Sequence, residues 1–144
     1  MFDSLFASKN KKLVLKLQKE HKHLVELVGI ILKAYEQNDQ KRLHKSLVEL
    51  KNIALTHLMT EDVEFYRLVK DSKRSSAEIE KLVHEFETSF GAIKLALIDF
   101  LDRYTVQDTL YDSEFIEKFK MIINVLQDRI EFEETHLYEA LLAS

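Results

Sequence analysis

Apolar residues recur every three or four positions along most of the chain, which is the spacing of one face of an α-helix. The turn-forming segments EQNDQ, KDSKRSSAE and YTVQDTLYDSE interrupt this pattern. The pattern therefore predicts four long helices, near residues 9–37, 40–70, 76–104 and 113–142. Short connections make consecutive helices antiparallel, so we expect one all-α domain over 1–144, an up-down-up-down four-helix bundle.

Residues suited to helix N-termini stand where the third and fourth helices are expected to begin. Ser75 and Glu78 have the spacing of a capping box. Asp112 or Ser113 is expected to cap the fourth helix, because a short polar side chain there can accept a hydrogen bond from a free backbone N–H.

Several polar side chains fall on faces that should point into the bundle. Successive side chains are about 100° apart around the axis of an α-helix. His21 lies at the centre of the first apolar stripe, whose other members are Val14, Leu17, Leu24, Val28 and Leu32. His57 and Glu61 both lie within the stripe of the second helix, and Glu64 lies at its edge. A leucine would be expected at such positions in an ordinary core.

The fourth helix adds a further acid to this interior. Glu133 lies on its apolar stripe, and Arg129 and His136 flank the stripe. Burial of uncompensated ions would cost several kcal/mol each. We therefore expect the inward-facing groups to share a metal ion or to neutralise one another, with Arg129 as a structural counter-ion beside Glu61 and Glu133.

The third helix has an entirely apolar inward face. Its stripe consists of Ile79, Val83, Phe86, Phe90, Ile93 and Leu97. His84 lies roughly 150° from the centre of this stripe by helical counting. It could reach the interior only if the helix were rotated so that the side with His84, Gly91, Leu95 and Ile98 faced inward.

Composition narrows the function classes. The chain has 21 Lys and Arg against 25 Asp and Glu, and the signs are interspersed, so no nucleic-acid surface is indicated. There is no cysteine for a disulfide or thiolate site. We find no membrane-spanning apolar run and no signal peptide in MFDSLFASKNKK, and we expect a cytoplasmic protein. No nucleophile triad, phosphate loop or nucleotide motif is present, which argues against an enzyme.

The segments KEHKHLVELV, LTHLMTEDVEFY and RIEFEETHLY resemble the first, second and last helices of hemerythrin-like domains, the HHE cation-binding group. This resemblance implies a four-helix bundle around a non-haem di-iron centre. It implies that His21, His57, Glu61 and Glu133 are ligands, with His84, His136 and Glu64 as weaker candidates. Arg129 departs from the family pattern, because it stands where the last helix should carry a histidine, and arginine stays protonated.

The Arg-x-x-x-Glu sequence of the last helix suggests a second resemblance. HKHLVEL, THLMTEDVEFY and DRIEFEETHL are similar to segments of the Rsd and AlgQ anti-sigma regulators, which bind a sigma factor. Two hypotheses follow. The first is a metal protein that uses iron, manganese or zinc to sense or carry oxygen, nitric oxide or redox equivalents. The alternative is a metal-free regulator of a protein partner, in which Arg129 replaces the charge of the metal.

Overall fold

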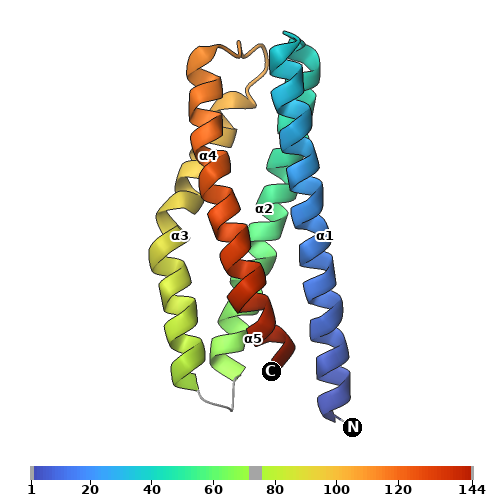
Figure 1. Ribbon diagram of the computed structural model, residues 1–144, viewed down its shortest axis with the longest axis vertical. Helices are drawn as coiled ribbons and strands as arrows, with labels where there is room; N and C mark the ends of the chain where they lie inside the picture. Colours follow the sequence, from blue (N-terminus) through green and yellow to red (C-terminus); the bar gives the residue numbers. More distant parts are fainter. Residues whose placement is uncertain (1, 72–75, 144) are drawn as a thin grey trace.

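The chain forms an antiparallel four-helix bundle, which confirms the predicted all-α architecture (Figure 1). The structure is a computed structural model that describes residues 2–71 and 76–143. Its elements are α1 (Phe2–Glu36), α2 (Gln40–Asp71), α3 (Ser76–Tyr104), α4 (Ser113–Phe132), the π-helical turn η1 (Glu133–Leu137) and α5 (Tyr138–Ala143). The predicted first boundary was wrong, because α1 begins at Phe2 rather than near residue 9. No proline or glycine lies between these points to end the helix.

Polar side chains and left-handed residues form the connections as the turn signals indicate. Asn38 ends α1 with φ of 54°, a conformation that asparagine tolerates well. The side chain of Asp39 then accepts a hydrogen bond of 3.1 Å from the backbone N–H of Arg42. Asp112 caps α4 by accepting from the backbone N–H of Phe115 at 3.1 Å, as predicted. The expected cap at Ser75 lies outside the described residues.

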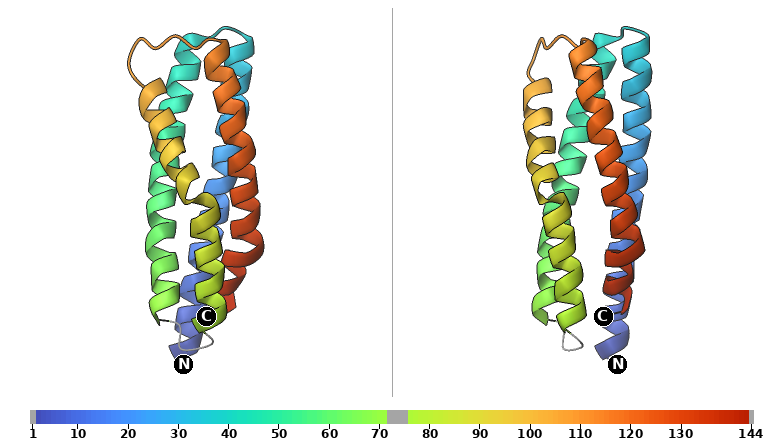
Figure 2. Two further views of the ribbon diagram at one scale, coloured as in Figure 1. Left: turned by 90° about the vertical axis from the view of Figure 1, so that its left-hand side faces the viewer. Right: turned by 60° about the vertical axis from the view of Figure 1, so that its left-hand side comes forward.

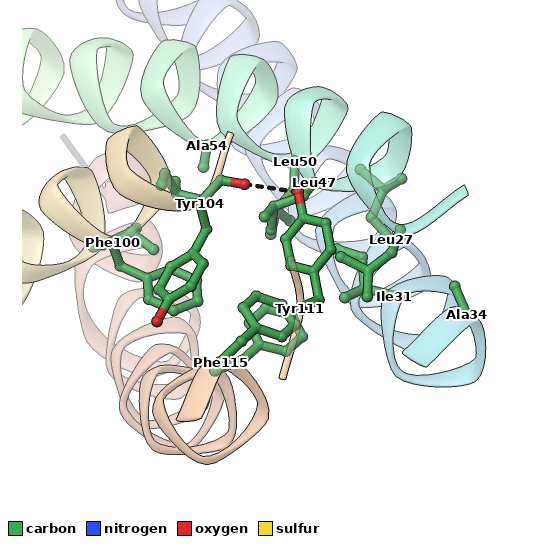
Figure 3. Packing of buried hydrophobic residues seen from close by; sticks show 14 of the residues in the cluster. Leu27, Ile31, Ala34, Leu47, Leu50, Ala54, Phe100, Tyr104, Tyr111 and Phe115 are labelled. Carbon is green, nitrogen blue, oxygen red and sulfur yellow. Dashed lines mark hydrogen bonds between the residues drawn. The ribbon is translucent and has the colours of Figure 1, made fainter. Parts of the chain in front are cut away.

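Two apolar cores occupy the bundle. The α1–α2 and α3–α4 connections lie at one end of the bundle, and the start of α1 and α5 lie toward the other (Figures 1 and 2). The first core lies toward the end with the α1–α2 and α3–α4 connections, and Figure 3 shows its packing. Its buried members include Leu27, Ile31, Leu43, Leu47, Leu50, Leu101, Phe115 and Phe119. The second core, nearer the chain termini, contains Val14, Leu17, Phe65, Leu68, Val83, Phe86, Leu137, Tyr138 and Leu141. No described helix combines the length and apolar character that a membrane crossing requires.

The buried face of α1 differs in part from the predicted stripe. Leu27, Ile31 and Ala34 are buried, whereas Leu24 and Val28 are only partly buried. The buried face therefore rotates around the helix axis toward the C-terminal end of α1. A steady sideways shift is expected when a straight helix of 3.6 residues per turn packs over many turns against neighbours at a slight angle.

The last helix contains a π turn that the sequence pattern did not indicate. In η1 the backbone N–H of Tyr138 donates to the carbonyl of Glu133, five residues earlier. One extra residue in this turn changes which later residues face inward. Leu141 is consequently buried, whereas Ala140 is only partly buried.

Candidate metal centre

Five polar side chains form a layer between the two apolar cores. We call them the polar cluster, and its members are His21, His57, Glu61, Arg129 and Glu133. None is more than 4% exposed, and Glu61 is 0% exposed. Burial this complete obliges the charges in the cluster to compensate one another or to hold a cation. The structure brings together the five side chains that were expected to point into the interior, although helical counting placed Arg129 at the flank of its stripe.

The two histidines and two carboxylates of the polar cluster point at a common centre. His21 Nε2 lies 3.0 Å from Glu133 Oε1. His57 Nε2 lies 3.1 Å from Glu61 Oε1 and 4.0 Å from Glu133 Oε1. Each of the four side chains thus offers one donor atom, and all four atoms lie within 4.8 Å of one another.

Each histidine is also held at its outer nitrogen by a second carboxylate. His57 Nδ1 lies 3.0 Å from Glu20 Oε1, and His21 Nδ1 lies 3.1 Å from Glu134 Oε1. Glu20 and Glu134 are partly exposed, at 20% and 41% of their side chains. A carboxylate at Nδ1 orients the ring and keeps a proton there, so that Nε2 faces the centre.

Arg129 supplies a fixed positive charge beside both buried carboxylates. Its Nε donates to Glu133 Oε2 at 3.2 Å, and its Nη2 lies 3.6 Å from Glu61 Oε1. Its Cζ lies 4.7 Å from the centre of the Phe86 ring, so the guanidinium also packs against the aromatic wall from α3. The expected counter-ion contacts are therefore present in the structure.

Tyr138 also contacts the polar cluster, from the first position after the π turn. Its hydroxyl donates to Glu61 Oε2 at 2.9 Å and lies 3.1 Å from His21 Nε2. Burial raises the pKa of Tyr138 well above its usual range, and the carboxylates of Glu61 and Glu133 add to this effect. Tyr138 therefore acts as a hydrogen-bond donor rather than as a phenolate.

Without a metal, the two buried carboxylates determine which side chains of the polar cluster are protonated. Burial alone would lower the pKa of His57, but the carboxylates of Glu133 and Glu61 raise it to about 10. Burial raises the pKa of Glu61 to about 7, against the opposing effect of His57. Burial acts the same way on Glu133, yet His21, His57, Glu61 and Arg129 hold its pKa well below its usual range. His57 is thus a cation in the metal-free protein at neutral pH.

One contact in the polar cluster tests whether a metal would fit. His57 Nε2 and Glu61 Oε1 face each other at 3.1 Å, but neither atom has a hydrogen-bond partner among the described residues. Buried atoms of this kind are rare, because each costs the desolvation of a polar group. An imidazole nitrogen and a carboxylate oxygen are also suitable ligands for iron, manganese or zinc. The donor set and the unsatisfied pair both fit a divalent cation.

The weaker ligand candidates lie away from the polar cluster. His84 and His136 are exposed, and Glu64 is partly buried with a contact of 3.4 Å to Arg67. The rotation of the third helix that would bring His84 inward does not occur, because Val83 and Phe86 are buried and Leu95 is 69% exposed.

Sequence reasoning did not identify Tyr138, Glu20 or Glu134. Helical counting directs Tyr138 away from Glu133, and the π turn that reverses this leaves no mark in the apolar pattern. Glu20 and Glu134 each adjoin a predicted ligand in the sequence. In a chain with 25 acidic residues, that adjacency alone does not distinguish them from solvated surface acids.

Comparison with known proteins agrees with this geometry. The family model described as hemerythrin HHE cation binding domain matches residues 13–141, which include every member of the polar cluster. No curated protein and no solved structure matches the chain. The comparisons thus support the first of the two resemblances and give no support to the second, with the anti-sigma regulators.

Proposed function

The chain belongs to the hemerythrin HHE cation-binding domain family, and we propose that it binds non-haem iron or another divalent metal through His21, His57, Glu61 and Glu133. We further propose that the metal serves to sense or carry oxygen, nitric oxide or redox equivalents. This role agrees with the lack of substrate-binding and nucleophile motifs in the sequence.

Donor atoms of four buried side chains, His21, His57, Glu61 and Glu133, lie within 4.8 Å of one another, and this convergence is the observation that carries the proposal. Within this group, His57 Nε2 and Glu61 Oε1 meet as an ion pair at 3.1 Å without forming a hydrogen bond. A divalent cation between the four donor atoms would satisfy both atoms at once. The histidine proton present at neutral pH would then be displaced, as is usual when a metal binds to histidine.

The residues around the polar cluster would shape this centre in distinct ways. Glu20 and Glu134 orient the two imidazoles, and the hydroxyl of Tyr138 donates a hydrogen bond to Glu61 Oε2. Phe86 and the second core below it exclude water, which strengthens every charge interaction in the layer. A bound iron with only four protein donors would retain open positions suited to a diatomic gas.

A metal-free regulator that binds a protein partner such as a sigma factor is the second candidate. The contacts of Arg129 to both carboxylates favour it, because Arg129 and a protonated His57 can neutralise Glu61 and Glu133 without a metal. In this candidate the contact between protonated His57 and Glu61 is an ion pair at 3.1 Å that forms no hydrogen bond.

Metal analysis separates the two candidates. The protein should be purified without a histidine tag from iron-replete cells, and a second sample should be reconstituted with ferrous iron under anaerobic conditions. We expect at least one transition-metal ion per chain by mass spectrometry, and its loss in the double variant His57→Gln, Glu61→Gln. His84→Gln is the matched control, because His84 is an exposed histidine away from the cluster. Protein free of transition metals after both treatments would establish the regulator instead.

A further inference from the structure

Arg129 lies beside the two buried carboxylates of the polar cluster. Its guanidinium is 4% exposed and lies against both Glu61 and Glu133, on the side closed by Phe86. It follows from the i, i+4 spacing of Arg129 and Glu133 on one helical face that this contact is built into the last helix.

Both buried carboxylates have only one oxygen directed at the histidines. Glu133 Oε1 faces His21 Nε2, while Glu133 Oε2 accepts from Arg129. Glu61 Oε1 faces His57 Nε2, while Glu61 Oε2 accepts from Tyr138. A carboxylate that gives one oxygen to each of two metal ions needs both of its oxygens free. In this chain the second oxygen of each is already bound by a hydrogen-bond donor.

The supply of donor atoms also matches a single ion. A metal with bond lengths of about 2.1 Å holds its ligand atoms roughly 3–4 Å apart, so small movements would bring the four donors into place. A second ion about 3.5–4 Å away would need ligands of its own. The four donors are the one such group found among the described residues, and α3 adds phenylalanines there rather than histidines.

We propose that Arg129 takes the place of the second metal ion, so that the centre binds one divalent cation per chain instead of a pair. The inference rests on the proposed metal-binding function. Arg129 would then set the number of metal ions, because its Nε donates a hydrogen bond to Glu133 Oε2 and its guanidinium adds a fixed positive charge.

Metal stoichiometry tests this directly. Untagged protein should be stripped with a chelator, reconstituted anaerobically with excess ferrous iron or cobalt(II), desalted and analysed for metal per folded chain. We expect one ion per chain, and the cobalt(II) visible spectrum should titrate to a single end point at one equivalent. Two ions per chain in the wild type would overturn the inference while leaving the proposed function intact. No bound ion would overturn the proposed function itself.

Variants at position 129 show whether Arg129 is the residue that limits the number. Arg129→His restores a histidine four residues before Glu133 and should raise the stoichiometry to two. Arg129→Lys keeps the charge and should remain at one. Arg103→His is the matched control, since it adds an imidazole at an exposed arginine and should also remain at one. A folded Arg129→His protein that still binds one ion would contradict the role assigned to Arg129, and the wild-type value remains decisive if that variant does not fold.

Discussion

Tyr138 donates its hydroxyl hydrogen to the buried carboxylate of Glu61 across the bundle, at 2.9 Å, from the position directly after a π turn. Glu133 begins this turn and belongs to the polar cluster. Because the hydrogen-bonded residues of a π turn are five positions apart, Tyr138 and Glu133 share one inward face, which a regular α-helix would not allow. The π turn therefore brings Glu133 and Tyr138, five positions apart in the sequence, to the same buried layer.

Loss of the Tyr138 hydroxyl should weaken the fold. Tyr138→Phe keeps the ring in the second core but leaves Glu61 Oε2 without its donor. We expect the free energy of unfolding of the metal-free protein to fall by about 1–3 kcal/mol, the usual cost of a buried polar group without a partner. Urea denaturation would measure the change. Tyr66→Phe, at a tyrosine that is 65% exposed, should change it by less than about 0.5 kcal/mol. Equal effects of the two substitutions would contradict the contact.

Helix order, most boundaries and the buried polar residues were predictable from the sequence, because a long amphipathic helix fixes which side faces its neighbours. His21, His57 and Glu61 lie in regular helices, where counting residues gives the correct direction. Tyr138 was not predictable, since a single π turn shifts all later residues without altering composition. Glu20 and Glu134 have partly exposed side chains that contact the buried histidines, and apolar periodicity does not indicate contacts of this kind.

Glu20 should control metal affinity without being a ligand. It accepts from His57 Nδ1 at 3.0 Å and so orients the ring that faces the centre. Glu20→Gln should weaken metal binding by about 10–100-fold, as is typical when an outer partner of a ligating histidine is changed. Competition with a fluorescent chelator would give the dissociation constant. Glu49→Gln is the matched control, because Glu49 pairs with the exposed His23 at 3.4 Å. Unchanged affinity in Glu20→Gln would show that His57 does not depend on this contact.

Alkaline pH should destabilise the metal-free protein through His57. The pKa of His57 is raised from 6.5 to about 10 by Glu133 and Glu61, although burial opposes this. Since the folded value is the higher one, the stabilisation is fully present below pH 6.5 and is lost as pH rises to about 10. The free energy of unfolding should fall by up to about 1.4 kcal/mol per pH unit in this window.

Urea denaturation in chelator-containing buffers would measure that slope. The pKa of Glu61 is raised from 4.5 to about 7, mainly by burial. Glu61 therefore changes the free energy of unfolding with pH only below about pH 7. His57→Gln should therefore flatten the dependence above neutral pH, whereas His23→Gln, at an exposed histidine, should retain the wild-type slope. If His57→Gln loses stability with pH as steeply as the wild type does, then His57 does not carry the buried proton.

Removal of the Arg129 guanidinium should be costly, and a bound metal should reduce the cost. In the metal-free protein, Arg129→Ala leaves Glu133 with one fewer donor and removes the permanent positive charge beside Glu61. Loss of one partner from a buried ion pair costs about 3–5 kcal/mol. A divalent cation between the same carboxylates supplies positive charge in its place, so the variant should regain part of this stability when loaded.

Four melting curves test this expectation, for the wild type and Arg129→Ala, each with a chelator and with saturating metal. The difference in melting temperature between the two proteins should be large with chelator and clearly smaller with metal. Arg67→Ala is the matched control, because Arg67 is an exposed arginine beside Glu64 and should behave like the wild type in both conditions. An Arg129→Ala deficit of the same size in both conditions would mean that the metal does not share the carboxylates with Arg129. In that case, the two positive charges would have to act at separate places in the bundle.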